Sequence, residues 1–149
     1  DLFLLSGPEV TSPSAASNER KTISVSFSTI DKGFRSGINE RKLVVMRTEK
    51  EWEEFWRLHK KTFLPEQQAP PVDFKQEMVI AVLSGEKRTG GYRVEITKIE
   101  EHRESIELIV HFHETQPPSN AMVTQALTQP YHIVKARRID LQVKFIPRS

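Results

Sequence analysis

The side chains best spaced for chemistry are two histidines at alternate positions of one segment, His111 and His113, with Glu114 directly after them. On a strand, residues i and i+2 point to the same face, so both imidazoles would lie on one side. If His132 came from a neighbouring strand, three nitrogen ligands of the kind that zinc uses could meet. Two histidines among solvated residues are, however, more often surface residues than metal ligands. We therefore expect no metal ion and no cofactor.

Other catalytic patterns are missing from the sequence. It contains no cysteine, which excludes disulfides, thiolate metal sites and a cysteine nucleophile. It contains no G-x-S-x-G motif of the kind that exposes a nucleophilic serine on a strained turn. The segment 85–91, GEKRTGG, lacks the G-K-[ST] ending of a phosphate loop and leads into a predicted strand rather than a helix. These features predict a protein that is not an enzyme.

Length and charge favour one globular domain without an electrostatic partner. The chain has 149 residues and a formal net charge of +2, from 22 basic and 20 acidic residues that are well mixed. This excess is too small to indicate nucleic acid or an anionic membrane as a partner, and basic pairs such as Lys87-Arg88 are typical of solvated surface. Because this length is that of one average domain, we expect residues 21–149 to form a single domain.

Residues 1–20 have the composition of a flexible tether. The segment Gly7 to Asn18 is small, polar and proline-containing, and the apolar segment Leu2 to Leu5 is too short to span a bilayer. The chain begins at Asp1 rather than Met, which leads us to expect that an upstream segment was removed or omitted. Such a tether suits a secreted or lipid-anchored protein, although a choice of where to begin the expressed chain explains it as well.

The longest informative stretch runs from Glu77 to Thr97. It opens with an apolar run, MVIAVL, that is typical of a strand buried on both faces. The glycine-rich segment 85–91 must turn, and the alternating segment after it, YRVEIT, is typical of a half-exposed strand. The pattern predicts a β-hairpin whose strands contribute to the core and whose charged tip is exposed.

One amphipathic helix is predicted at about residues 48–62. Thr48 and Glu51 form a capping box at its start. Aromatic residues follow at helical spacing and place Trp52, Phe55, Trp56 and His59 on one face. Such a stripe could form an aromatic ligand site, but it more often covers the open face of a sheet.

The remaining alternating segments complete a mainly β fold. Strands are predicted at 22–30, 41–47, 77–84, 91–98, 105–114, 131–136 and 139–146. Because the connections are short, the strands should be antiparallel. We predict an antiparallel β-barrel or β-sandwich of about seven strands, with the helix packed on its open face.

Alternating strand directions place the connections at two ends of this fold. The tip 85–91 and the long proline-rich segment 115–130 should share one end, and the plain turns 99–104 and 137–140 the other. An elaborated end on a rigid sheet is typical of a recognition surface. The alternative is that long loops are simply tolerated insertions.

The motif V-D-F-x-x-E-M-V-I-A-V-x-x-G-E-K-x-T-G-G-Y-x-V-E-I, from Val72 to Ile96, resembles the C-terminal domain of PrcB-like protease-complex subunits. Supporting matches are R-T-E-x-E-W-E-x-F-W at 47–56 and P-Y-H-I-V-K at 130–135, so that the similarity covers roughly 22–146. The resemblance implies a non-catalytic, extracytoplasmic domain, periplasmic or secreted and in some relatives a lipoprotein. Its implied role is to associate with a secreted subtilisin-like protease and to stabilise or help assemble it.

This resemblance and the shared end select the candidate partner-binding residues. They are Gly85, Glu86, Lys87, Arg88, Thr89, Gly90, Gly91, Tyr92, Gln129, Pro130, Tyr131 and His132. Two other functions stay open. The tip T-G-G-Y is similar to the T-T-G-Y loop of chagasin-type cysteine protease inhibitors, which favours a direct protease inhibitor that presents loops 85–91 and 115–130. The aromatic helix stripe favours a small-molecule or glycan-binding module.

Overall fold

The computed structural model describes residues 21–149, so the predicted tether at residues 1–20 lies outside the described part of the chain. One helix, α2 (Glu49–His59), accompanies eight strands in this part. The strands are β2 (Thr22–Ser24), β3 (Phe27–Gly33), β4 (Lys42–Met46), β5 (Glu77–Leu83), β6 (Arg93–His102), β7 (Glu107–Thr115), β8 (Tyr131–Arg137) and β9 (Gln142–Arg148).

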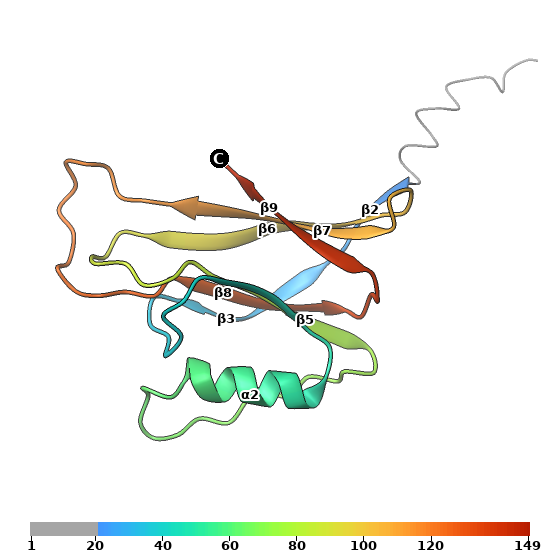
Figure 1. Ribbon diagram of the computed structural model, residues 1–149, viewed down its shortest axis with the longest axis horizontal. Coiled ribbons are helices and arrows are strands. Elements are labelled where there is room, and N and C mark those ends of the chain that lie inside the picture. The colour runs from blue at the N-terminus through green and yellow to red at the C-terminus, as the bar shows by residue number, and fades with distance from the viewer. Residues whose placement is uncertain (1–20) are drawn as a thin grey trace, which may run out of the picture.

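The strands form two four-stranded sheets, with the orders β2-β6-β7-β9 and β3-β8-β5-β4. The sheets face one another as a sandwich, and α2 covers the outer face of the second sheet (Figure 1). The prediction of a mainly β fold with one covering helix is therefore confirmed, in the form of a sandwich rather than a barrel. All strand pairs are antiparallel except β7 and β9, which are parallel.

The predicted strand at 22–30 is in fact two strands, because the chain crosses between the sheets there. β2 pairs with β6 in the first sheet, and β3 pairs with β8 in the second. Val25 lies at the crossing, where it is buried and its N–H donates to the carbonyl of Ile99 at 2.8 Å. The alternation of Ile23, Val25 and Phe27 continues across the crossing, and so does not reveal it.

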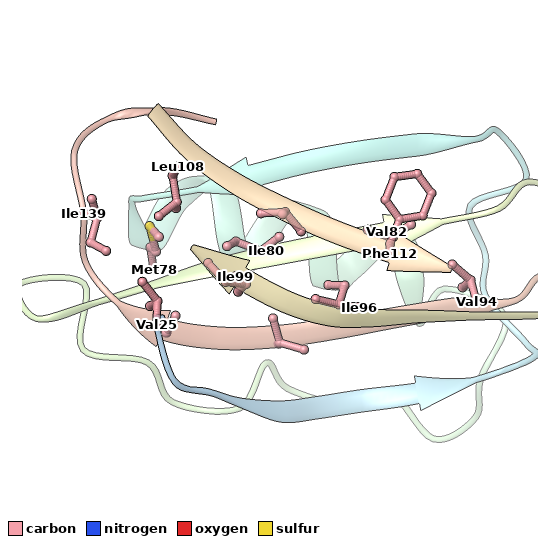
Figure 2. Packing of buried hydrophobic residues seen from close by; sticks show 13 residues of the cluster. Val25, Met78, Ile80, Val82, Val94, Ile96, Ile99, Leu108, Phe112 and Ile139 are labelled. Carbon is pink, nitrogen blue, oxygen red and sulfur yellow. The ribbon is translucent and has the colours of Figure 1, made fainter. Parts of the chain in front are cut away.

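The core between the sheets is built from alternate residues of the inner strands (Figure 2). Met78, Ile80 and Val82 of β5 face Leu108 and Phe112 of β7 across the sandwich, and all five side chains are buried. The intervening residues of β5 point the other way, toward the helix. β5 is therefore buried on both faces, as its continuous apolar run predicts.

The helix attaches to the outer face of the second sheet through the predicted aromatic stripe. Trp52, Phe55, Trp56 and His59 are all buried in a second apolar cluster, which includes Val79, Ala81 and Leu83 of β5. The cap is confirmed in part: the Thr48 hydroxyl accepts from the Glu51 N–H at 3.2 Å. The Glu51 carboxylate reaches back to accept from the N–H of Arg47 at 3.0 Å and from the Thr48 hydroxyl at 3.1 Å.

The predicted hairpin at 77–97 is wrong. β5 and β6 belong to different sheets, where β5 pairs with β4 and β8, and β6 pairs with β2 and β7. Packed sheets lie about 10 Å apart, and residues 84–92 are long enough to bridge them. β8 and β9 are separated in the same way, because β9 crosses to pair with β7.

The strands nonetheless alternate in direction, so the prediction of which connections share an end is confirmed. Leu83 at the end of β5 pairs with Tyr131 at the start of β8, and Arg93 at the start of β6 pairs with Thr115 at the end of β7. The connections 84–92 and 116–130 therefore leave from one end of the sandwich (left in Figure 1). The turns 103–106 and 138–141 lie at the other end.

Among the described residues, no helix has the length and apolarity needed to cross a membrane.

Candidate functional site: a three-loop rim

Three connections meet at the elaborated end of the sandwich: 34–41, 84–92 and 116–130 (Figure 1). We refer to them together as the rim. The sequence prediction included the second and third loops but not the first. Hydrogen bonds between the loops make the rim one surface rather than three independent segments.

The second and third loops are joined along their lengths. Lys87 and Thr128 form a short antiparallel bridge, with N–H to carbonyl distances of 2.8 and 2.9 Å in the two directions. Farther out, the N–H of Gly90 donates to the carbonyl of Thr124 at 2.9 Å. The Thr128 hydroxyl donates to the carbonyl of Thr89 at 2.8 Å. Backbone bonds of this kind fix the loops whatever their exposed side chains are.

Gly91 allows the closest approach between these two loops. Its φ is +93°, a backbone conformation that residues with a Cβ rarely adopt. A Cβ at this position would lie 2.8 Å from a side-chain carbon of Pro117 and 3.1 Å from one of Val123. At Gly90, by contrast, an added Cβ would be 3.5 Å from Thr124, which is an ordinary contact. Of the two adjacent glycines, only Gly91 is required by the packing.

Gln129, which belongs to the third loop, joins that loop to the first and the second. Its side-chain carbonyl accepts from the N–H of Ser36 at 3.0 Å, and its amide nitrogen donates to the carboxylate of Glu86 at 2.8 Å. Its backbone N–H donates to the carbonyl of Phe34 at 2.7 Å. The N–H of Glu86 donates to the carbonyl of Asn39 at 2.9 Å. Gln129 is thus the residue through which all three loops are tied.

A buried polar chain supports the first loop from below. The Ser36 hydroxyl lies 2.8 Å from Nδ1 of His59, and Nε2 of His59 lies 3.0 Å from the carboxylate of Asp31. Burial alone would raise the pKa of Asp31, but hydrogen bonds from His59, Lys60 and Tyr131 and the charge of Lys60 lower it to about 2. Asp31 is therefore ionised at neutral pH, and we assign Nε2–H of His59 as its donor and Nδ1 as the acceptor for Ser36.

These three residues have the composition of a Ser-His-Asp hydrolase triad, but their burial and hydrogen bonds indicate a structural role. Ser36 is only 4% exposed, and its hydroxyl oxygen also accepts from the N–H of Ile38 at 3.1 Å. A nucleophile needs access to a substrate carbonyl, which this hydroxyl does not have. The N–H of Gly37 donates to the carbonyl of His59 at 2.7 Å, so the first loop is attached directly to the end of α2.

Apart from the glycines Gly85, Gly90 and Gly91, which lie in the second loop, the predicted partner-binding residues divide into a presented group and a supporting group. The presented side chains, exposed or half-buried, are those of Glu86, Lys87, Arg88, Thr89, Tyr92 and Gln129. The supporting group, Pro130, Tyr131 and His132, is buried at the start of β8. The Gln129–Pro130 bond is not cis; within residues 21–149 the cis peptide bond is Leu64–Pro65.

His132 illustrates the supporting role. Its Nδ1 accepts from the N–H of Ile96 at 2.9 Å, and its Nε2 lies 2.8 Å from the hydroxyl of Thr29. Burial, followed by the charge of Lys32, lowers the pKa of His132 to about 4. This neutral imidazole joins the two sheets just below the rim.

The three-histidine grouping considered from the sequence does not form. His111 and His113 lie on β7 in the first sheet, and His132 lies on β8 in the second. Nε2 of His111 is 2.8 Å from the Glu100 carboxylate, and its Nδ1 accepts from Arg148 at 2.9 Å. Within residues 21–149, no cluster of three such side chains could hold a metal ion.

The rim exposes large apolar side chains. Phe34 is 49% exposed and Leu127 60% exposed, and Met122 is fully exposed. In the described part of the chain, the other large apolar residues with this exposure are Leu64, after α2, and Ile106, at the opposite end. The aromatic stripe on α2 offers no such surface, because Trp52 and Trp56 are buried in the core. This burial weighs against the small-molecule or glycan-binding alternative.

The fold and the site together define a helix-covered β-sandwich domain that carries a hydrogen-bonded loop surface at one end. Residues 78–136 match the family model described as PrcB C-terminal. The resemblance predicted from the sequence is therefore confirmed over this part of the chain, which is similar to the C-terminal domain of the PrcB family. The match runs from β5 into β8 and includes the second and third rim loops. No curated protein and no solved structure matched the chain in the same comparison.

Proposed function

We propose that this domain is a non-catalytic, extracytoplasmic binding module that associates with a secreted protease, of the subtilisin-like class, through the rim, and stabilises or helps to assemble it. The match to the PrcB C-terminal family suggests a domain associated with a protease complex. A non-catalytic subunit is consistent with the rim, where the buried Ser36 hydroxyl acts in a structural brace.

The observation that carries the proposal is the exposure of Phe34, Met122 and Leu127 on loops that are fixed to one another. Exposed apolar side chains that gather on one surface are typical of protein interaction sites. Methionine adapts its shape to a partner, and aromatic residues contribute large contact areas. Because the loops are already ordered, association would cost little of the entropy that flexible loops lose on binding.

The test is affinity capture with the immobilised domain from the secreted fraction of the source organism, followed by mass spectrometry. We expect a protease to be enriched on the wild-type domain. Replacing Met122→Ser together with Leu127→Ser should weaken its binding about tenfold or more, since central apolar contacts dominate interface energies. A matched control, Leu64→Ser with Ile106→Ser, removes two exposed apolar side chains outside the rim and should bind like wild type.

The captured protease also separates assembly from inhibition, the alternative in which the rim loops enter the active-site cleft. Hydrolysis of a short peptide substrate is measured while the domain is added in increasing amounts. Unchanged turnover, with a longer lifetime of the protease at elevated temperature, is the expected result. Dose-dependent loss of turnover would favour the inhibitor, and capture of no protease, or equal capture by the rim variant, would refute the proposal.

A further inference from the structure

We propose that a hollow beside the rim anchors an acidic side chain of the partner protein, an Asp or Glu carboxylate held by Lys87 and Arg93. This inference rests on the proposed function and names the chemistry of one contact within it. The hollow has a volume of about 230 Å³ and lies between the sheets at the rim end, where β5 and β7 end and β6 begins. Its lining includes Arg41, Tyr92 and Glu114 as well as the two proposed anchors.

The one carboxylate in the lining is already satisfied. Glu114 accepts from the Arg41 guanidinium through one oxygen and from the Ser84 hydroxyl through the other, both at 2.9 Å. This pairing neutralises Arg41 and fixes one wall of the hollow. The charges of Lys87 and Arg93 then remain, so the hollow is positive overall.

Neither of these two cations has an ion-pair partner among the described residues. The Lys87 ammonium lies 5.4 Å from the centre of the Tyr92 ring, a cation–π distance that holds it at the hollow. The backbone of Lys87 is fixed by its bridge to Thr128, and Arg93 is fixed by the pairing of β6 with β7. Lys87 is thus held at both its backbone and its ammonium group, and Arg93 at its backbone, which reduces the freedom that is lost when the two cations bind an anion.

The neighbouring loop cannot supply the missing negative charge. Residues 116–130 contain no Asp or Glu, and the nearest acidic residue of the second loop, Glu86, is bonded to Gln129. The hollow has the dimensions of a single side chain rather than of an extended basic track, which favours a carboxylate presented singly by a folded protein over a polyanion.

The probe is a pair of blocked tripeptides, acetyl-Gly-Glu-Gly-amide and acetyl-Gly-Gln-Gly-amide, titrated at low ionic strength into the ¹⁵N-labelled chain. Amide shifts are followed by NMR. We expect the glutamyl peptide to shift the resonances of Lys87, Tyr92, Arg93 and Thr115 in a saturable way, and the glutaminyl peptide to bind about tenfold more weakly or not at all. Equal shifts with both peptides, or glutamyl shifts spread over the whole surface, would overturn the inference.

Variants locate the contact. Lys87→Met with Arg93→Met should abolish the glutamyl shifts, while Lys144→Met with Arg103→Met, which removes the same charges from exposed positions away from the rim, should preserve them. The protease capture described above tests the acidic anchor separately from the proposed binding of a protease by the rim. If capture by the Lys87/Arg93 variant equals that of wild type, the anchor is wrong and the rim proposal stands. If the peptide result holds but wild type captures no protease, the proposed function fails instead.

Discussion

The same strands run between the two ends of the sandwich, but the loops at the two ends are fixed by different hydrogen bonds. At the rim, the three loops bond to one another through Gln129 and the Lys87–Thr128 bridge. At the opposite end, the turn 138–141 is joined to the segments before and after α2, mainly through the side chains of Arg47 and Arg138. The 103–106 turn donates to the carbonyl of Lys21, and the carbonyls of Ile139 and Leu141 accept from Arg47. Within residues 21–149, the turns 103–106 and 138–141 exchange no hydrogen bond.

The rim loops are joined to one another largely through their backbones, whereas the turn 138–141 is joined to its neighbours largely through arginine side chains. Loops that satisfy one another's groups form a cooperative unit, so that a change in one displaces the others. The rim also depends on a support beneath it, the Ser36–His59–Asp31 chain, whereas the plain end is supported by part-buried bonds from Arg47 and Arg138 to backbone carbonyls.

The largest expected effect is at this support. Replacing His59→Ala removes a fully buried ring that lies 4.4 Å from the centre of the Tyr131 ring and leaves Asp31 and Ser36 without their partner. The resulting cavity and the lost hydrogen bonds should lower the free energy of unfolding by about 3 kcal/mol. Urea denaturation of wild type and variant measures this change in the free energy of unfolding. The matched control is His102→Ala at the plain end, where the side chain is 36% exposed and a change of about 0.5 kcal/mol or less is expected. Equal losses at the two sites would contradict the idea that the buried His59 supports its end of the sandwich more than the partly exposed His102 supports the other.

The next effect concerns acid stability. The pKa of Asp31 is lowered to about 2 in the folded protein, from its ordinary value of 3.8. The stabilisation is therefore fully present above about pH 4 and is lost as the pH falls toward 2, because protonation then weakens the bonds to His59 and Lys60. The shift corresponds to about 2 kcal/mol.

Asp31→Asn tests the origin of this pH dependence. The free energy of unfolding of wild type and variant is measured between pH 6 and pH 2. We expect the wild type to lose about 2 kcal/mol more than the variant over this range, since the variant has no carboxylate to titrate at this position. Parallel curves for the two proteins would assign the acid sensitivity to other groups, such as Glu100, whose pKa is also lowered to about 2 against its burial, by bonds from Lys98, His111 and His102.

A smaller effect distinguishes the two adjacent glycines of the second loop. Gly91→Ala forces a Cβ into a left-handed backbone conformation and against Pro117, which should lower the free energy of unfolding by about 1.5 kcal/mol and weaken partner binding. Gly90→Ala, where the added Cβ meets Thr124 at 3.5 Å, should change stability by about 0.5 kcal/mol or less. Thermal unfolding of both variants measures the difference. Identical melting temperatures would show that the rim tolerates displacement at Gly91.

The sequence predicts these regions unequally, and the reason is the range of the interactions. The buried strand β5 and the helix stripe are encoded by local periodicity, and both were predicted. The assignment of β5 and β6 to different sheets depends on β8, which begins at Tyr131, far along the chain from the end of β5 at Leu83, and lies between β3 and β5 in the sheet. No local pattern in residues 77–97 encodes that competition, so a hairpin was the natural but wrong expectation.

The rim was predicted in part for the same reason. Because successive strands run in opposite directions, every second connection lies at the same end of the sandwich. This rule alone places 84–92 and 116–130 together. The first loop, 34–41, joins them through the side chain of Gln129 and through His59 beneath it, contacts between residues distant in the chain. The segment 31–39, DKGFRSGIN, has the glycine content of a turn, but nothing in it indicates which loops lie beside it. Likewise, Arg93 and Glu114 come together at the hollow only because β6 pairs with β7.

The smallest expected effect is a gain of stability at the plain end. Ile106 has a φ of +57°, which is unfavourable for a β-branched residue, and its side chain is 64% exposed, so that little burial compensates for the strain. Ile106→Asn places a residue that tolerates the left-handed region at this turn and should raise the free energy of unfolding by about 0.5–1 kcal/mol. The variant should still bind the partner as wild type does, because the turn shares no hydrogen bond with the rim. A loss of stability, or weaker partner binding, would show that the plain end has a role beyond reversing the chain.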